Sequence, residues 1–190
     1  MNKQLILASQ SPRRQEMLHN LNIPFIVRTK QIDESVVTTN NPHEKVKHLA
    51  ILKGKSISLV QNEVVLAADT VVAFEGTIFG KPKSKKEAYD MISTLSGNTH
   101  EVFTGVAIHS RENEISFVER TEVTWWPLNE EIIEWYINSD EPYDKAGAYG
   151  IQNLGAALVK KINGDYFNVV GLPIARVVRE LSNFGINIFK

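Results

Sequence analysis

The sequence predicts an α/β protein built on a mixed β-sheet with helices packed against it. Short apolar runs typical of buried strands alternate with segments of helical periodicity. Most of the helical segments begin at a small polar residue or a proline, which are common first residues of helices. Residues 100–126 have strand character on both sides of a polar turn, which predicts one long antiparallel hairpin. Strands interleaved with helices favour parallel pairs and the hairpin adds antiparallel ones, so we expect a mixed sheet.

The expected elements follow one another along the whole chain. Strands are predicted at residues 5–8, 25–27, 64–68, 71–74, 77–79 and 157–162, besides the hairpin. Helices are predicted to begin at Ser11-Pro12, Asn41-Pro42, Ser84, Asn129 and Pro173. Glu44 stands where a capping box places its acid, and the apolar spacing of that helix extends to Val60. The dipeptide Glu75-Gly76 fits a tight turn between two short strands.

Composition and charge limit what the chain does. Its 190 residues amount to about one domain, so a single domain spanning residues 1–190 is expected. Lys and Arg total 21 against 22 Asp and Glu, a net charge of −1 that argues against a broad basic face for nucleic acid or an anionic membrane. The absence of cysteine excludes disulfide bonds, a thiolate nucleophile and thiolate zinc sites. No apolar run reaches the roughly 18 residues of a membrane span and no signal-peptide pattern begins the chain, so we expect a cytoplasmic protein.

The first candidate site is residues 9–14, which join a predicted strand to a predicted helix. Such a turn offers free backbone N–H groups and the positive end of a helix dipole. Ser9 adds a hydroxyl, and Arg13 and Arg14 add guanidinium groups, which together suit a polyanion such as a phosphate chain. The alternative is that both arginines only solvate the first turn. Because cations are mildly unfavourable at a helix N-terminus, the functional interpretation is favoured.

Acidic residues make the second candidate site. Asp69 and Thr70 follow an apolar strand, and the carboxyl ends of strands are where α/β sheets usually bind ligands. A carboxylate there can bind a divalent cation or accept a proton from water, whereas the common alternative is a carboxylate that caps a turn. The pair Asp33-Glu34 can supply a second carboxylate for magnesium or manganese, although an acidic pair in a polar loop is usually only solvated.

Two lysines and a glutamine complete the candidates. Lys53 falls on the apolar face of its predicted helix, where an ammonium group is costly unless it is paired or catalytic. Lys81 stands beside Pro82 in a stiff loop soon after the apolar strand. Gln152 ends a segment rich in Gly and Ala, residues 144–152, whose small side chains let a ligand approach the backbone. Its amide can recognise a base edge through one donor and one acceptor.

Several short motifs occur in a specific order. They are Leu5-Ile6-Leu7-Ala8-Ser9-Gln10-Ser11-Pro12-Arg13-Arg14, Ala68-Asp69-Thr70, Gly80-Lys81-Pro82, Leu95-Ser96-Gly97, and the segments 144–152 and 164–173. In this order they resemble the motifs of the Maf family, the septum-formation-inhibitor-like nucleotide pyrophosphatases. The resemblance covers essentially the whole chain and is highly specific.

The resemblance implies an elongated mixed sheet akin to that of the inosine triphosphate pyrophosphatases, with a nucleotide held in a cleft. It implies hydrolysis of a nucleoside triphosphate to the monophosphate and pyrophosphate, with a divalent metal cation (Mg²⁺ or Mn²⁺) as cofactor. Arg13, Thr70 and Gln152 match the subgroup that acts on dTTP and UTP, whereas the 7-methyl-GTP subgroup typically has tryptophan, glutamine and glutamate at these places. The implied roles are proton acceptance by Asp69, cation binding by Asp69 and Glu34, catalysis by Lys53 and Lys81, and substrate binding or specificity by Ser9, Arg13, Arg14, Thr70 and Gln152.

Two other functions stay open from the sequence. A non-enzymatic regulator of septum formation or division would bind a protein or nucleic acid, and the near-neutral charge counts against nucleic acid. A pyrophosphatase of the same mechanism could instead act on modified purine triphosphates. For the enzyme, the physiological role is either house-cleaning of the nucleotide pool or arrest of division. Trp125 and Trp126, with the long hairpin, offer surfaces for a homodimer.

Overall fold

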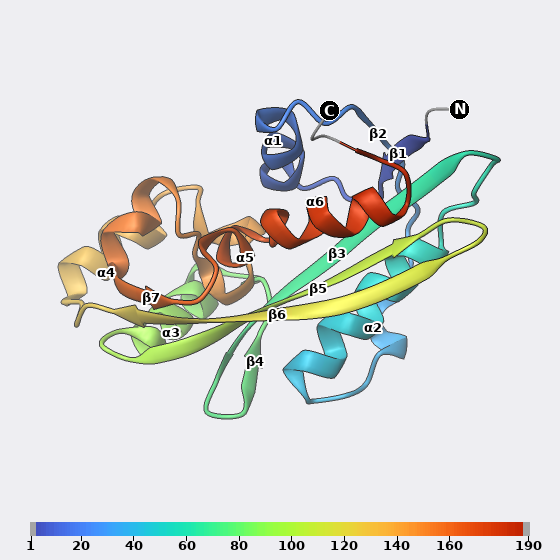
Figure 1. Ribbon diagram of the computed structural model, residues 1–190. Helices are drawn as coiled ribbons and strands as arrows, with labels where there is room; N and C mark the ends of the chain where they lie inside the picture. The colour runs from blue at the N-terminus through green and yellow to red at the C-terminus, as the bar shows by residue number, and fades with distance from the viewer. Residues whose placement is uncertain (1–2, 188–190) are drawn as a thin grey trace.

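A mixed sheet runs through the middle of the molecule. The computed structural model describes residues 3–187. The strands are β1 (Gln4–Leu7), β2 (Phe25–Val27), β3 (Glu63–Phe74), β4 (Thr77–Phe79), β5 (Thr99–His109), β6 (Glu114–Trp125) and β7 (Val159–Asn163). Their order in the sheet is β2-β1-β3-β5-β6-β7, and β4 pairs with β3 beside this path. Because β1 is parallel to β2 and β3 while the other pairs are antiparallel, the predicted mixed sheet is confirmed. The long strands β3, β5 and β6 give the sheet its elongated shape (Figure 1).

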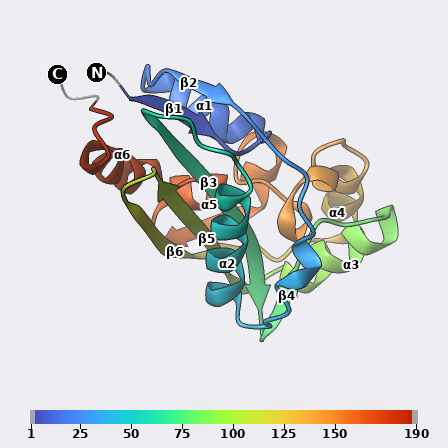
Figure 2. The same cartoon turned by 90° about the vertical axis from the view of Figure 1, so that its right-hand side faces the viewer.

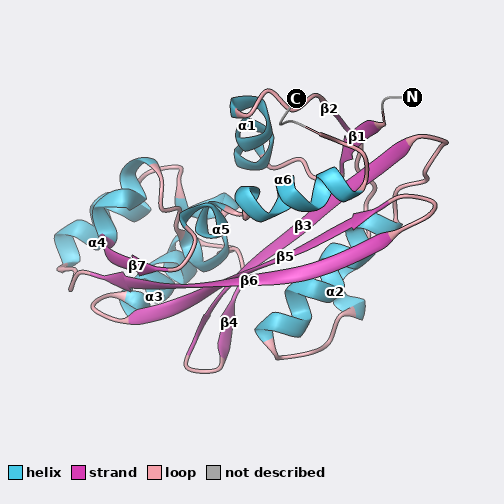
Figure 3. Ribbon diagram, in the orientation of Figure 1, coloured by secondary structure: helices cyan, strands magenta, loops and turns pink. Residues whose placement is uncertain are grey.

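Helices cover both faces of this sheet (Figure 3). They are α1 (Pro12–Asn20), α2 (Pro42–Lys55), α3 (Lys85–Leu95), α4 (Glu130–Ile137), α5 (Tyr166–Val170) and α6 (Ile174–Asn183). The helix α2 lies across one face, where Figure 2 shows it in front of the long strands. The helices α1 and α6 pack on the opposite face, and α3 and α4 pack at the far end of that face. No helix among residues 3–187 is long and apolar enough to cross a membrane.

Strand alternation divides the core between the two faces. Successive side chains of a strand point to opposite sides, so every second residue of β3 faces α2. On that side Val71 and Phe103 pack against Val46 of α2. On the other side Val64 and Leu66 belong to the large apolar cluster under α1 and α6. Each face of the sheet is therefore buried along most of β3, as its nearly continuous apolar sequence predicts.

The neighbours of β3 leave a gap along one of its edges. Leu66 is the last residue of β3 in register with β1, and Val72 is the first in register with β4. Asp69 and Thr70 lie between them, while β5 pairs without interruption along the other edge. The expectation that the strand ends at Asp69 and Thr70 is therefore wrong, because pairing with β5 carries the ladder through both residues to Ala73, and the strand ends at Phe74.

Other expectations about the elements are partly confirmed. Asn41 caps α2 by accepting a hydrogen bond from the Glu44 N–H at 3.1 Å. The helix ends at Lys55 rather than reaching Val60, which is exposed, while Ile57 is buried against β1 and β3. The short helix α5 was not expected from the periodicity. Trp125 is buried in the core at 1% exposure, so of the proposed tryptophan pair only Trp126 (50%) lies on the surface, and the homodimer stays a prediction.

One glycine sets how closely α2 approaches the sheet. A Cβ atom at Gly105 of β5 would lie 2.3 Å from the backbone oxygen of Val46 in α2. No real Cβ atom tolerates such a contact, so a larger residue would push the helix away from the sheet. This close packing determines where α2 holds its lysines relative to β3.

Candidate active site

A cleft of about 1350 Å³ opens at the gap beside β3. Its walls come from the start of α1, the inner side of α2, the β3–β4 hairpin and the irregular segment between α4 and β7. All nine residues that the sequence singled out line it: Ser9, Arg13, Arg14, Glu34, Lys53, Asp69, Thr70, Lys81 and Gln152. The fold thus brings together side chains from widely separated segments.

The α2 face of the gap holds a cluster of charges. Lys53 Nζ lies 2.5 Å from Asp69 Oδ1 and 2.9 Å from Glu34 Oε1. The Asp69 side chain is largely buried at 12% exposure, whereas that of Glu34, on the 3₁₀ turn Glu34–Val36, is 53% exposed. The ion pairs explain how a lysine is accommodated on the apolar face of α2, next to the buried Ala50.

One oxygen of the Asp69 carboxylate stays available to a ligand. Within residues 3–187 the only hydrogen bond to this carboxylate comes from Lys53 and reaches Oδ1. Asp69 lines the cleft, and its second oxygen, Oδ2, forms no hydrogen bond within residues 3–187 and so keeps its acceptor capacity. Lys53 therefore holds the carboxylate in place through Oδ1 and leaves Oδ2 as a free acceptor.

Arg14 lies on the opposite face of the gap and is held by four hydrogen bonds. Its Nε donates to the carbonyl of Gly171 at 2.7 Å, and Nη1 donates to the carbonyl of Ala68 at 2.8 Å and to Ser9 Oγ at 3.2 Å. Its Nη2 donates to Thr70 Oγ1 at 3.0 Å. The Ala68 carbonyl belongs to the gap, so Arg14 supplies a donor where a neighbouring strand would otherwise do so. Burial lowers the pKa of the Arg14 guanidinium to about 10, which leaves it charged at pH 7.

Arg13 spans the cleft instead of facing into a wall. Its Nη1 lies 2.9 Å from Asp144 Oδ2, on the other side of the opening. Lys145 Nζ binds the second oxygen of Asp144 at 2.7 Å. Desolvation by burial would raise the pKa of Asp144. The hydrogen bonds from Lys145 and Arg13, together with their positive charges, outweigh it and lower the pKa. Two cations that are suited to an anionic ligand are thus paired with one exposed carboxylate.

Gln152 stands on a loop that is held by its neighbours. The Glu141 carboxylate accepts hydrogen bonds from the N–H groups of Leu154 at 3.0 Å and Gly155 at 3.3 Å. The Tyr136 hydroxyl accepts one from the Gly150 N–H at 3.3 Å. The Gln152 amide itself forms no hydrogen bond within residues 3–187, so its donor and its acceptor are both available to a ligand.

A buried aromatic group supports the apolar wall of the cleft. Tyr149 lines the cleft, and its hydroxyl lies 2.7 Å from His100 Nε2. Trp125 contacts both rings edge-on. Burial lowers the pKa of His100 to about 4 and raises the pKa of Tyr149, so both side chains are neutral at pH 7.

Two lysines in the cleft have no partner. Lys81 is exposed after the β3–β4 hairpin, and Lys45 lies two turns before Lys53 on α2. Neither forms an ion pair within the described part of the chain. Both are therefore free to meet an anionic ligand.

The sequence did not point to several residues that shape the site. Asp144 and Lys145 begin the segment rich in small residues, and their opposite charges are the signal that could have identified them as part of the site. Gly171 holds Arg14 directly and lies in the motif of residues 164–173, whereas Thr104 holds Arg14 through Thr70 and no local pattern marks it. These contacts join residues that are far apart in the sequence.

Comparison with known proteins adds independent findings. A family model described as Maf-like protein matches residues 4–184. A dTTP/UTP pyrophosphatase from Bacillus cereus is 49% identical over 187 residues, 98% of either chain. Another from Bacillus cytotoxicus is 51% identical over 183 residues, 96% of either chain. Among solved structures, the Ham1 protein of Staphylococcus aureus is similar with a TM-score of 0.55 at 15% identity, over 96% of this chain and 100% of that one. This last likeness concerns the fold alone and agrees with the expected α/β fold.

Proposed function

The chain belongs to the Maf-like protein family, and on that premise we propose that it hydrolyses dTTP and UTP to the nucleoside monophosphate and pyrophosphate. The observation that carries the proposal is the Asp69 carboxylate, held through one oxygen by Lys53 and open to the cleft through the other. The activity for which this protein's relatives are named, and the cations around the same cleft, support the choice of a triphosphate as substrate. The cellular task is house-cleaning of the nucleotide pool in the cytoplasm.

Asp69 is the proposed proton acceptor. Its free oxygen takes a proton from a water molecule as the water oxygen bonds to the α-phosphorus. The bond between the α-phosphorus and the oxygen that bridges to the β-phosphorus breaks, and that oxygen leaves with pyrophosphate. Lys53 keeps the carboxylate oriented during this step, at 2.5 Å from Oδ1.

Cations from two segments offset the charge of the substrate. A nucleoside triphosphate carries about four negative charges, so it needs several positive groups close by. Arg13 and Arg14 at the start of α1 and Lys81 after the hairpin line the cleft. Backbone N–H groups at the start of α1 and the Ser9 hydroxyl add hydrogen bonds to phosphate oxygens.

Asp69 and Glu34 are the proposed ligands of a divalent cation. They come from different elements, and Lys53 Nζ contacts both carboxylates. Among residues 3–187 no group of three or more His, Cys, Asp or Glu residues could hold a metal. Mg²⁺ commonly uses one or two carboxylates together with substrate phosphates, so two suffice. When bound, the cation supplies positive charge to the phosphate oxygens around the reacting bond.

Gln152 is proposed to select the base. A uracil or thymine ring presents a carbonyl oxygen next to an N–H group, and one amide can match both. Tyr149, Ile151 and Val72 supply apolar surface in the same cleft. Guanine and hypoxanthine also present a carbonyl oxygen next to an N–H group, so their larger ring system is what disfavours them at the same place.

The test is release of pyrophosphate from a panel of triphosphates. The panel contains dTTP, UTP, CTP, GTP, ITP and 7-methyl-GTP, each with Mg²⁺, with Mn²⁺ and with a chelator. We expect cation-dependent release from dTTP and UTP and its loss in a folded Asp69→Asn variant. Release from purines alone would refute the base selection. A folded chain that releases nothing from any triphosphate would refute the proposed function and favour a non-enzymatic regulator.

A further inference from the structure

A chain of hydrogen bonds runs behind Arg14 through the middle of the sheet. Arg14 Nη2 donates to Thr70 Oγ1 at 3.0 Å, and Thr70 Oγ1 lies 2.9 Å from Thr104 Oγ1. Thr104 Oγ1 donates its only proton to the backbone carbonyl of Asn168 at 3.0 Å. Thr70 must therefore be the donor in its bond to Thr104. All these bonds run in one direction, from the guanidinium to the Asn168 carbonyl.

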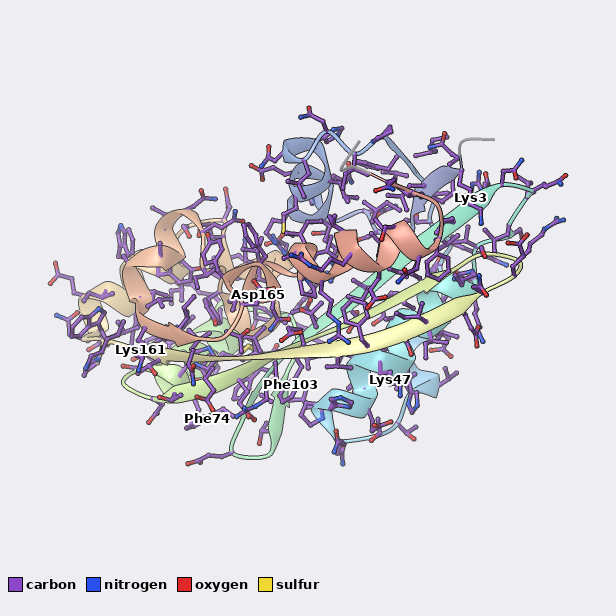
Figure 4. The ribbon with its side chains drawn as sticks, viewed as in Figure 1. Lys3, Lys47, Phe74, Phe103, Lys161 and Asp165 are labelled. Carbon is purple, nitrogen blue, oxygen red and sulfur yellow. The ribbon has the colours of Figure 1, made fainter. Side chains whose placement is uncertain are left out.

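The side chain of Asn168 fixes the far end of this hydrogen-bonded chain. It is fully buried, and its Nδ2 donates to the Val102 carbonyl at 3.0 Å and to Thr121 Oγ1 at 2.9 Å. Because a backbone carbonyl can only accept, the atom that faces Val102 is the amide nitrogen. Thr121 Oγ1 also donates to the Asp165 carbonyl at 3.0 Å. Figure 4 labels Asp165 where the chain enters α5.

The segment that contains Asn168 also contacts Arg14 directly. Its Gly171 carbonyl accepts from Arg14 Nε at 2.7 Å. Gly171 has a φ of +121°, a conformation that side chains rarely adopt, and this backbone turn presents the carbonyl to Arg14. One segment therefore holds the guanidinium twice, once through Gly171 and once through Asn168, Thr104 and Thr70.

We infer that Thr104 and Asn168 are positioning residues that hold Arg14 with its charge toward the phosphate chain of the substrate. Both side chains are 0% exposed and neither lines the cleft, so neither touches a ligand there, and the hydrogen bonds described above link them to Arg14. The identity of the anion, a nucleoside triphosphate, rests on the proposed function. The arrangement of the hydrogen bonds does not depend on it.

Thr104→Val is the central test. It replaces the hydroxyl by a methyl group of the same shape and interrupts the chain between Thr70 and Asn168. Residues that orient a directly binding group typically contribute about ten- to a hundredfold, so we expect kcat/KM for dTTP to fall about tenfold. The change should lie mainly in KM, because Arg14 binds the anion and does not contact the water that attacks.

Two variants separate positioning from general destabilisation. Thr104→Ser keeps the hydroxyl and should keep kcat/KM within about twofold of the wild type. Val106→Ala truncates a buried neighbour on the same face of β5 without touching the hydrogen-bonded chain, and it should leave kcat/KM unchanged. An equal loss in Val106→Ala, or no recovery in Thr104→Ser, would overturn the inference.

A double variant tests whether Thr104 acts through Arg14. In an Arg14→Lys background the hydrogen-bonded chain has lost its guanidinium donor, so adding Thr104→Val should change kcat/KM by less than about twofold. If the two losses instead multiply, Thr104 acts independently of Arg14 and the inference is wrong.

Binding of inorganic tripolyphosphate separates this inference from the proposed function, because it needs no turnover. Calorimetry should show binding to the wild-type chain and a Kd about tenfold higher for Thr104→Val. If that difference holds while no nucleotide is hydrolysed, the inference stands and the proposed function fails. If nucleotides are hydrolysed and Thr104→Val matches the wild type in Kd and KM, only the inference fails. A wild-type chain that does not bind tripolyphosphate overturns it as well.

Discussion

The two faces of β3 meet at the same gap, and they hold their charged groups in different ways. On the α2 face, Asp69, Lys53 and Glu34 are joined by ion pairs between side chains, and Glu34 is exposed. On the opposite face, Arg14 donates four hydrogen bonds, two of them to backbone carbonyls. Removing a group on the first face leaves no backbone group unpaired, whereas removing Arg14 does. The comparison indicates that the α2 face carries the reacting groups and the Arg14 face carries a rigid support.

The largest effect is expected on the α2 face. Asp69→Asn removes the proton acceptor and should lower kcat by about a thousandfold, within the range of general-base catalysis. Lys53 keeps Glu34 as a partner, so the free energy of unfolding should change by less than about 1 kcal/mol. Pyrophosphate release and urea unfolding measure the two quantities. Glu34→Gln is the comparison variant and should mainly raise the Mg²⁺ concentration needed for half-maximal rate. Full activity of Asp69→Asn would contradict the assigned role.

On the other face the expected loss is in stability. A lysine at position 14 cannot reproduce the planar fork of the guanidinium, so the carbonyl of Gly171 or Ala68 loses its donor. We expect Arg14→Lys to lower the free energy of unfolding by about 2–3 kcal/mol, the cost of leaving buried polar groups unpaired. Arg13→Lys is the matched control, because among residues 3–187 Arg13 pairs only with the exposed Asp144. Equal urea midpoints for the two variants would remove the proposed difference between the faces.

The buried His100 should also make the free energy of unfolding depend on pH. The pKa of His100 is about 4 in the folded chain, against about 6.5 when it is exposed. Between these values the unfolded chain binds a proton that the folded chain does not, so stability falls as the pH drops from 6.5 to 4. The shift corresponds to a loss of about 2–3 kcal/mol over that window.

Urea unfolding at pH 7, 5.5 and 4.5 checks this pH dependence. His100→Gln keeps a hydrogen-bonding nitrogen near Tyr149 but does not titrate, so its stability should fall less steeply with pH. His19 is exposed, and His19→Gln should retain the wild-type slope. A wild-type slope in His100→Gln would show that another group causes the pH dependence.

The smallest effect is expected at the opening between the faces. Asp144 pairs with Arg13 and places a negative charge where the triphosphate is proposed to bind. Asp144→Asn frees Arg13 and removes that repulsion, so KM for dTTP should fall about two- to threefold at low salt, as for other exposed ion pairs. The difference should shrink in 0.5 M salt, which screens exposed charges. Asp90→Asn, which breaks an exposed pair with Lys86 outside the cleft, should leave KM unchanged. A higher KM in Asp144→Asn would show that the carboxylate helps to bind substrate.

Much of the fold could be predicted because its signals are local. The capping residue Asn41 and the apolar run after Glu63 indicate a helix and a strand without any tertiary contact. The tight turn at Glu75 and Gly76 is likewise a property of the dipeptide, whose two φ angles are positive. The end of β3 could not be predicted in this way, because the strand continues through Asp69 only by pairing with β5.

By itself the sequence determined most of the segments that form helices and strands, except α5 and the end of β3, and through its motifs it indicated nine residues of the candidate site. Tertiary structure alone decided that Asp69 and Thr70 serve opposite faces of one gap, and that Arg14 takes the place of a missing strand neighbour at Ala68. It also decided that Arg13 meets Asp144 across the opening. The physical reason is that propensity, capping and periodicity act over a few residues, whereas these contacts join segments that are adjacent only after the sheet has formed.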